Sequence, residues 1–233
     1  MPDATFDPNK VTIHPGVKLG RGVVIHDFCV IGLPPRGASP GERETIIGDG
    51  AVIRPFTTIY GGVTIGRNFQ TGQGASIREG NVIGDDSSVG TLVILEVGNR
   101  IGNHVRIHGG SGLEHTTVGD HVIIGPNVFF VSDPHPACPR YTECVLGPTI
   151  GRYTRIGGSV VVNPGVTIGE NCLIGSGAVV TRDIPPNTVA AGSPARERLR
   201  IEQLKCFKGL YPRAYAWDPP ELFDPALFPP NGE

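Results

Sequence analysis

Residues 47–66 read IGDGAVIRPFTTIYGGVTIG, and every sixth residue of this stretch, starting at Ile47, is isoleucine. The same step continues to Ile107, and Thr71 is the one residue met on the way that is not valine, isoleucine or leucine. A period of six fits neither the 3.6-residue turn of an α-helix nor the two-residue alternation of a hairpin sheet. It predicts a unit that returns each sixth residue to an inward-facing position.

A second period, of eighteen residues, lies on top of the first. A glycine followed by turn-forming residues comes after the aliphatic residue at Gly48, Gly66, Gly84 and Gly102. Glycine, aspartate and asparagine supply the bends that a strand lacks. Three short strands per eighteen residues therefore predict one triangular coil, and successive coils stack as parallel strands about 4.8 Å apart. The step of six also holds at further positions: Ile13, Leu19, Ile25, Ile31, Val118, Ile124, Phe130, Ile150, Ile156, Val162, Ile168, Ile174 and Val180.

The composition agrees with a β-rich protein, since valine and isoleucine together number 45 against 12 leucines. The net charge of -2 gives no concentrated basic field, so neither nucleic acid nor a membrane is expected as a partner. No segment is apolar for long enough to form an export signal or a membrane span. Five scattered cysteines without a C-x-x-C pair predict free thiols in the cytoplasm.

This repeat resembles the hexapeptide family of left-handed parallel β-helices, and the resemblance covers roughly residues 11–192. It implies an all-β fold with about eight coils in a domain of residues 1–192. Two loops, 33–45 and 131–149, interrupt the ladder with proline, glycine and charged residues, and such loops are where a rigid solenoid places function. Residues 193–233 are expected to form a short amphipathic helix and a proline-rich tail, with Trp217 packed against a coil.

Two segments, SDPHPACPR (residues 132–140) and VTRDIPPNTVAAGSPAR (residues 180–196), resemble the hexapeptide acyltransferases, especially the sugar O-acetyltransferases. The resemblance implies acetyl transfer from acetyl-CoA, and it makes His135 the general base because imidazole titrates near pH 6.5. It makes Gly158 the residue whose backbone N–H stabilises the oxyanion. The family also implies a homotrimer with its clefts between neighbouring subunits.

The same resemblance assigns a cofactor groove and an acceptor site. The small residues Ser176, Gly177 and Ala178 would admit the arm of acetyl-CoA, and Thr181, Arg182 and Arg196 would meet its far, phosphorylated end. A tryptophan common in the sugar acetyltransferases is replaced here by Arg155, which suits a more polar or anionic acceptor such as a nucleotide-linked sugar. Asp133 and Arg78 complete the predicted acceptor site, although a charge ladder between Arg78 and Glu96 explains that arginine equally well.

Two other functions compete with this prediction. Four histidines between residues 104 and 121 suggest a gamma-class carbonic anhydrase, which uses the same coil. Only His108 fits one of its three zinc ligands, because Asn103 and Arg67 stand at the other two positions, so no metal site is predicted. His104 and His121 share a turn column, which leaves adventitious metal binding open. The third possibility is a non-catalytic assembly subunit, which would not bind acetyl-CoA.

Overall fold

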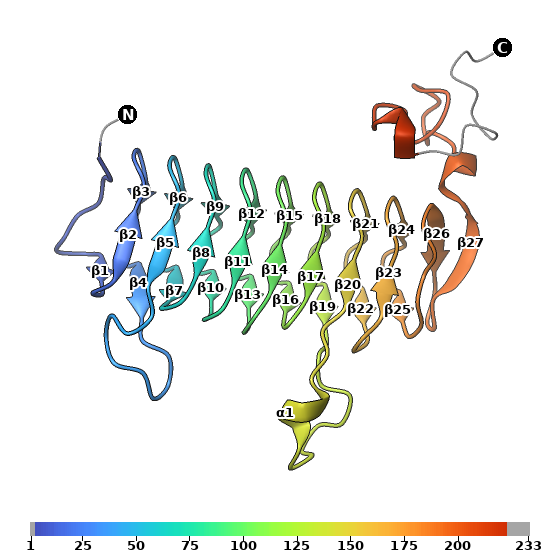
Figure 1. Ribbon diagram of the computed structural model, residues 1–233. Helices are drawn as coiled ribbons and strands as arrows, with labels where there is room; N and C mark the ends of the chain where they lie inside the picture. The colour runs from blue at the N-terminus through green and yellow to red at the C-terminus, as the bar shows by residue number, and fades with distance from the viewer. Residues whose placement is uncertain (1–2, 223–233) are drawn as a thin grey trace.

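The six-residue repeat folds as a short strand followed by a turn, and three such units close one coil of a left-handed parallel β-helix (Figure 1). The computed structural model describes residues 3–222. Strands eighteen residues apart pair in parallel and in register, as Ser76 does with Ile94. The fold class predicted from the period is therefore confirmed.

The strands form three sheets, one on each side of the solenoid, which we call sheets I, II and III. Sheet I contains β1 (Thr12–Ile13), β4 (Val30–Leu33), β7 (Thr58–Tyr60), β10 (Ser76–Ile77), β13 (Ile94–Leu95), β16 (Gly112–Leu113), β19 (Phe129–Phe130), β22 (Val161–Val162) and β25 (Val179–Val180). Sheet II contains β2 (Val17–Leu19), β5 (Thr45–Ile47), β8 (Thr64–Ile65), β11 (Val82–Ile83), β14 (Arg100–Ile101), β17 (Thr117–Val118), β20 (Thr149–Ile150) and β23 (Thr167–Ile168). Sheet III contains β3 (Val24–Ile25), β6 (Val52–Ile53), β9 (Gln70–Thr71), β12 (Ser88–Val89), β15 (Arg106–Ile107), β18 (Ile123–Ile124), β21 (Arg155–Ile156), β24 (Leu173–Ile174), β26 (Thr188–Ala191) and β27 (Arg196–Arg200).

The aliphatic ladder forms the core of the solenoid. From Ile25 to Val180 its members are buried, and the side chains of Ile59 and Ile77 are fully enclosed. Burying a side chain of this size contributes roughly 1.5–3 kcal/mol, so the column supplies most of the driving force for folding. Thr71 interrupts the ladder without leaving its hydroxyl unpaired, because the Arg54 N–H donates to Thr71 Oγ1 at 2.8 Å.

The chain visits the sheets in the order I, II, III, and so the solenoid has three corners, I–II, II–III and III–I. Both predicted loops leave from corner I–II, one between β4 and β5 and the other between β19 and β20 (Figure 1). The second loop carries the short helix α1 (Tyr141–Cys144). Both insertions therefore protrude from one corner of the solenoid, and the strands on either side of each insertion still pair in parallel with strands of neighbouring coils.

The predicted C-terminal helix is wrong. Residues 196–200 form β27, which pairs antiparallel with β26, and the 3₁₀ turn η1 (Ile201–Gln203) follows it. The reason is the open edge of the last coil, whose backbone groups need partners and obtain them from a strand but not from a short helix. The sheets thus continue to Arg200, past the predicted domain boundary at residue 192. A second 3₁₀ turn, η2 (Pro220–Leu222), closes the described part of the tail.

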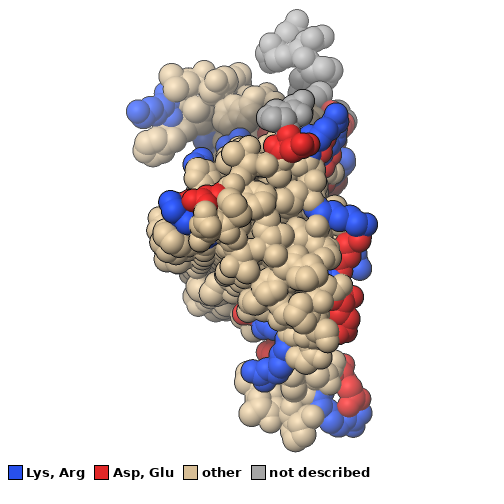
Figure 2. Space-filling model, turned by 90° about the vertical axis from the view of Figure 1, so that its left-hand side faces the viewer, with Lys and Arg blue, Asp and Glu red and all other residues tan. Residues whose placement is uncertain are grey.

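Charged side chains pair from coil to coil along the outside. Arg67 Nη2 lies 2.7 Å from Asp85 Oδ2, and Arg21 Nη2 lies 3.3 Å from Asp49 Oδ2. Figure 2 shows basic and acidic atoms side by side along one edge of the molecule. No helix within residues 3–222 has the length and apolar character needed to cross a bilayer.

Candidate active site

His135 lies in the loop that leaves corner I–II after β19. The Leu146 N–H donates to the Ser132 carbonyl oxygen at 2.9 Å and closes the base of the loop. Within it, the His135 N–H donates to Asp133 Oδ1 at 2.9 Å, which fixes the backbone beside the histidine. The imidazole itself is exposed. Asp133 therefore fixes the main chain of the loop, and the His135 ring remains accessible at this corner.

A cavity of about 290 Å³ opens at the base of this loop, on the outer face of sheet I. Its floor is apolar and includes Ile94, Gly112 and the ring of Phe129, which is 49% exposed. A Cβ at Gly112 would meet the Phe129 ring at 3.0–3.1 Å, so this glycine makes room for the aromatic floor. The carboxylates at its edge are those of Glu96, Glu114 and Asp133.

Gly158 stands at corner III–I, in the turn between β21 and β22. Its φ is not positive, and the left-handed residue of that turn is Ser159, with a φ of 57°. A Cβ at Gly158 would lie 3.3 Å from the carbonyl oxygen of Pro126 and 3.4 Å from its ring. The glycine is therefore required by close packing on the preceding coil and not by its φ angle.

In two successive coils, the first turn residue at this corner keeps a free backbone donor. Among residues 3–222, neither the Gly158 N–H nor the Ser176 N–H of the next coil meets a protein acceptor. Corner II–III differs, because there Asp and Asn side chains accept the equivalent N–H, as Asp85 Oδ1 does from Arg67 at 2.7 Å. Corner III–I thus presents two unpaired donors on neighbouring coils, at Gly158 and Ser176, about 4.8 Å apart as the coils stack and flanked by small side chains.

The structure divides the other predicted cofactor residues between two corners. Ser176 and Gly177 are exposed at corner III–I and Ala178 is buried beneath them, whereas Thr181 and Arg182 are exposed at corner I–II, across β25. Arg196 begins β27, and its Nη1 donates to the Ala195 carbonyl oxygen at 2.9 Å. Within one chain the residues from Ser176 to Ala178 therefore lie with Gly158, and Thr181 and Arg182 lie at the corner that carries the His135 loop.

His135 and Gly158 are likewise not brought together within one chain. The His135 loop leaves sheet I at corner I–II, while Gly158 enters sheet I at corner III–I, so the strands of sheet I separate them. A site that uses both residues needs corners from two protomers.

The two arginines predicted for the acceptor site are engaged by other side chains. Arg78 Nη1 lies 3.0 Å from Glu96 Oε2 and Arg78 Nη2 lies 3.0 Å from Glu79 Oε1, and these acids, Glu79 first, raise the pKa of the guanidinium. Arg155 forms an ion pair with Asp218, and its Nη1 donates to Asn171 Oδ1 at 2.9 Å. The ladder expected between Arg78 and Glu96 is confirmed.

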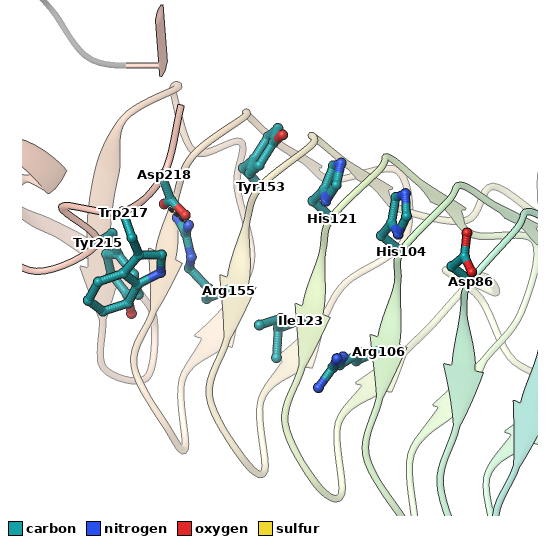
Figure 3. A pocket seen from close by; sticks show the side chains of 10 residues that line it. All are labelled: Asp86, His104, Arg106, His121, Ile123, Tyr153, Arg155, Tyr215, Trp217 and Asp218. Carbon is teal, nitrogen blue, oxygen red and sulfur yellow. Dashed lines mark hydrogen bonds and ion pairs between the residues drawn. The ribbon is translucent and has the colours of Figure 1, made fainter. Parts of the chain in front are cut away.

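A second cavity, of about 410 Å³, lies between sheet III, corner II–III and the C-terminal tail (Figure 3). His104, His121 and Tyr153 form a column of stacked rings along its upper side, with centroids 4.6 and 4.5 Å apart. The column shared by the two histidines was predicted from the sequence, but Tyr153 was not recognised as its third member. Its signal was available, because His121 and Tyr153 each stand two residues after a repeat glycine.

The tail closes one end of this second cavity. Tyr215, Trp217 and Asp218 lie against the solenoid there, and Arg155 Cζ lies 4.0 Å from the centroid of the Tyr215 ring. Burial raises the pKa of the Tyr215 phenol. Within residues 3–222, no three His, Cys, Asp or Glu side chains are grouped so that they could hold a metal ion, and His104 and His121 are stacked on each other.

A three-sided parallel β-helix of six-residue units defines a class of proteins, and the sequence comparisons show what the chain is similar to within it. Residues 147–182 match the family model described as bacterial transferase hexapeptide (six repeats). This segment of the solenoid is therefore similar to the hexapeptide-repeat family.

Three relatives illustrate its range. Galactoside O-acetyltransferase of Escherichia coli is 51% identical over 84 residues, 34% of this chain and 41% of that protein. The bifunctional protein GlmU of Nocardia farcinica is 29% identical over 202 residues, 82% of this chain and 38% of that protein. The UDP-N-acetylglucosamine acyltransferase of Campylobacter jejuni, at 21% identity and a TM-score of 0.59 over 84% of this chain and 75% of that one, shares the fold. The matches span 38–44% of the length of the first curated relatives.

Proposed function

We propose that the protein is an acetyltransferase that moves the acetyl group of acetyl-CoA to a hydroxyl or amine of a sugar. The observation that carries the proposal is the free N–H of Gly158, which lies beside the small residues of corner III–I within the segment that matches the transferase repeat. The relative with 51% identity, a galactoside O-acetyltransferase, supports the same reaction class.

The residues of corner III–I fit the donor substrate. Acetyl-CoA has a long arm with amide groups, and the unpaired N–H groups of Gly158 and Ser176 offer it hydrogen bonds. Gly177 is exposed and a Cβ there would meet nothing within 4 Å, so the space beside the turn is open. Thr181, Arg182 and Arg196 are exposed donors suited to its phosphates.

In the reaction, His135 accepts the proton of the acceptor hydroxyl or ammonium as the freed oxygen or nitrogen attacks the thioester carbonyl carbon. The Gly158 N–H donates to the carbonyl oxygen while negative charge develops on it. The carbon–sulfur bond then breaks, and the proton passes from His135 to the departing sulfur, which gives the acetylated sugar and free coenzyme A.

His135 and Gly158 lie at different corners, and so we infer a homotrimer in which the His135 loop of one protomer meets corner III–I of the next. The exposed side chains of Ile94, Phe129 and Val131 near the loop base support contact with a second chain. The five cysteines are free thiols, which suits the cytoplasm.

The charges around the cavity at the loop base limit which class of sugar can be the acceptor. Glu96, Glu114 and Asp133 border it, and Arg78 is already neutralised by two acids. This charge favours a neutral or amino sugar over a nucleotide-linked one, because phosphates would lie close to carboxylates.

A thiol-release assay with acetyl-CoA, run across neutral sugars, amino sugars and nucleotide-linked sugars, tests the proposal. Release of coenzyme A that depends on a sugar supports it, and His135→Ala should lower kcat/KM by about 10²-fold or more. His115→Ala is the matched control, because His115 is exposed at the same corner one coil earlier. This substitution is expected to leave kcat/KM unchanged. Absence of sugar-dependent release with all three classes, or a normal rate for His135→Ala, would contradict the mechanism.

A further inference from the structure

We infer that the second cavity, between sheet III and the tail, binds a phosphate ester of a ring compound at a site distinct from the acetyl-transfer site. The volume of about 410 Å³ lies within the range of small-molecule pockets. Neither His135 nor Gly158 lines it. The inference therefore stands independently of the proposed acetyl transfer.

Arg106 supplies the charge for the phosphate. It projects outward from β15 into the cavity, and its guanidinium makes no hydrogen bond or ion pair with any of residues 3–222. The other arginine, Arg155, is neutralised by Asp218. An unpaired guanidinium at the side of an open cavity is suited to a phosphate, which its planar fork binds with two hydrogen bonds.

The ring column adds further hydrogen-bonding groups next to Arg106. His104, His121 and Tyr153 use their faces on one another, so their edges, with the imidazole nitrogens and the phenol hydroxyl, are what they can offer a ligand. Figure 3 shows this column running above Arg106 and Ile123 on the same side of the solenoid. A phosphate on Arg106 thus has donors on the corner as well as on the sheet.

Trp217 supplies the surface for the ring. Its indole meets Tyr215 and Tyr211 edge to face, and it remains 64% exposed at the end of the cavity, so a ring face stays open for stacking. The ion pair between Arg155 and Asp218 anchors this part of the tail, because both side chains are nearly buried. The cavity therefore combines an end with the guanidinium of Arg106, where the Asp86 carboxylate already accepts a hydrogen bond from the Asn68 side chain at 2.8 Å, and an aromatic end, which a phosphorylated nucleoside or sugar matches.

The sequence contains a single tryptophan, so its fluorescence reports on this cavity alone. The full-length protein is titrated with uridine 5′-monophosphate, glucose 1-phosphate, uridine and inorganic phosphate, with calorimetry as a second readout. At least one of the two esters should change the Trp217 emission, and it should bind about tenfold or more tighter than phosphate alone. If uridine 5′-monophosphate binds more tightly, the ring compound is a nucleoside. If glucose 1-phosphate binds more tightly, it is a sugar.

Arg106→Gln should lower the affinity for that ester by about tenfold or more, since the substitution removes a charged hydrogen bond. Arg100→Gln is the matched control, because Arg100 occupies the same outward position on the neighbouring sheet II strand of that coil. Trp217→Leu should lower the affinity for the ester but not the affinity for inorganic phosphate, both measured by calorimetry.

Four results would overturn the inference. They are binding of neither ester, equal affinity for Arg106→Gln and the parent, equal weakening by Arg100→Gln, and displacement of the ester by coenzyme A at one-to-one stoichiometry. The last would make the cavity part of the donor site.

Discussion

Mixing two inactive variants tests whether the active site is shared between protomers. His135→Ala removes the base from corner I–II and leaves corner III–I intact. Gly158→Val does the reverse, because its side chain would press on Pro126, 3.3–3.4 Å from the new Cβ, and cover the space beside the N–H. The backbone itself tolerates the change, since the φ of Gly158 is not positive. Each variant alone should be inactive and folded.

The expected recovery follows from the arrangement of the two corners. In a cyclic trimer, each interface pairs corner I–II of one protomer with corner III–I of the next. An interface is intact when a Gly158→Val chain supplies His135 and a His135→Ala chain supplies Gly158. Every trimer that contains both chains has one such interface among its three, so kcat per mixed trimer should return to about a third of the parent value.

The assay is sugar-dependent thiol release after the two chains are co-expressed and purified through different tags. Co-expression of His135→Ala with a chain carrying both substitutions is the control, because no interface is then intact and activity should stay absent. A mixed trimer that remains inactive would refute the shared site, since it would mean that both residues must come from the same chain.

Three further predictions concern stability and reactivity. Ile124→Ala, in the enclosed ladder, should lower the free energy of unfolding in urea by about 2–5 kcal/mol, whereas Ile123→Ala, at a side chain 41% exposed on the same strand, should cost far less. In a background where the loop cysteines are serine, a thiol reagent at pH 8 should label Cys206 first, because the Tyr211 N–H lowers its pKa, and should label Cys172 only on unfolding, because burial raises its pKa to about 11. The side-chain hydrogen bond from its arginine partner lowers the pKa of Asp85, so its contribution to stability is present above the unfolded pKa of about 3.9 and is lost as the pH falls below it. Asp85→Asn should therefore flatten the pH dependence of unfolding in acid, and an unchanged slope would contradict this.

The solenoid could be predicted from the sequence because its stability is local and repeated. From Ile47 to Leu113 each ladder residue meets the residue eighteen positions away, as Ile77 meets Leu95, so the spacing in the sequence predicts the contacts directly. The two loops were predicted for the same reason, since they break that spacing. The structure has one coil more than the eight expected, because Val180 in β25 begins a ninth coil, which β26 completes.

The tail could not be predicted in this way. Leu199, Ile201 and Leu204 have a helical spacing, but the open edge of β26 offers backbone partners that no local pattern records. The ion pair between Arg155 and Asp218 joins residues 63 positions apart, and no repeat relates them. Arg155 was predicted to face an acceptor for the same reason, since neither the repeat nor a motif indicates Asp218 as its partner.

Strand β21 connects the second cavity to the turn that contains Gly158, and through it the tail could affect catalysis. Its first residue, Arg155, holds the tail through Asp218 at the edge of the second cavity, and the turn that follows its second residue contains Gly158. Strands of neighbouring coils hold each other through backbone hydrogen bonds, as the Arg155 N–H donates to the Cys172 carbonyl oxygen at 2.8 Å. Because Gly158 follows Arg155 by only three residues, we expect a change in the contact between the tail and Arg155 to alter the position of the Gly158 N–H. Occupancy of the second cavity and the rate of transfer should for this reason be measured on the same protein.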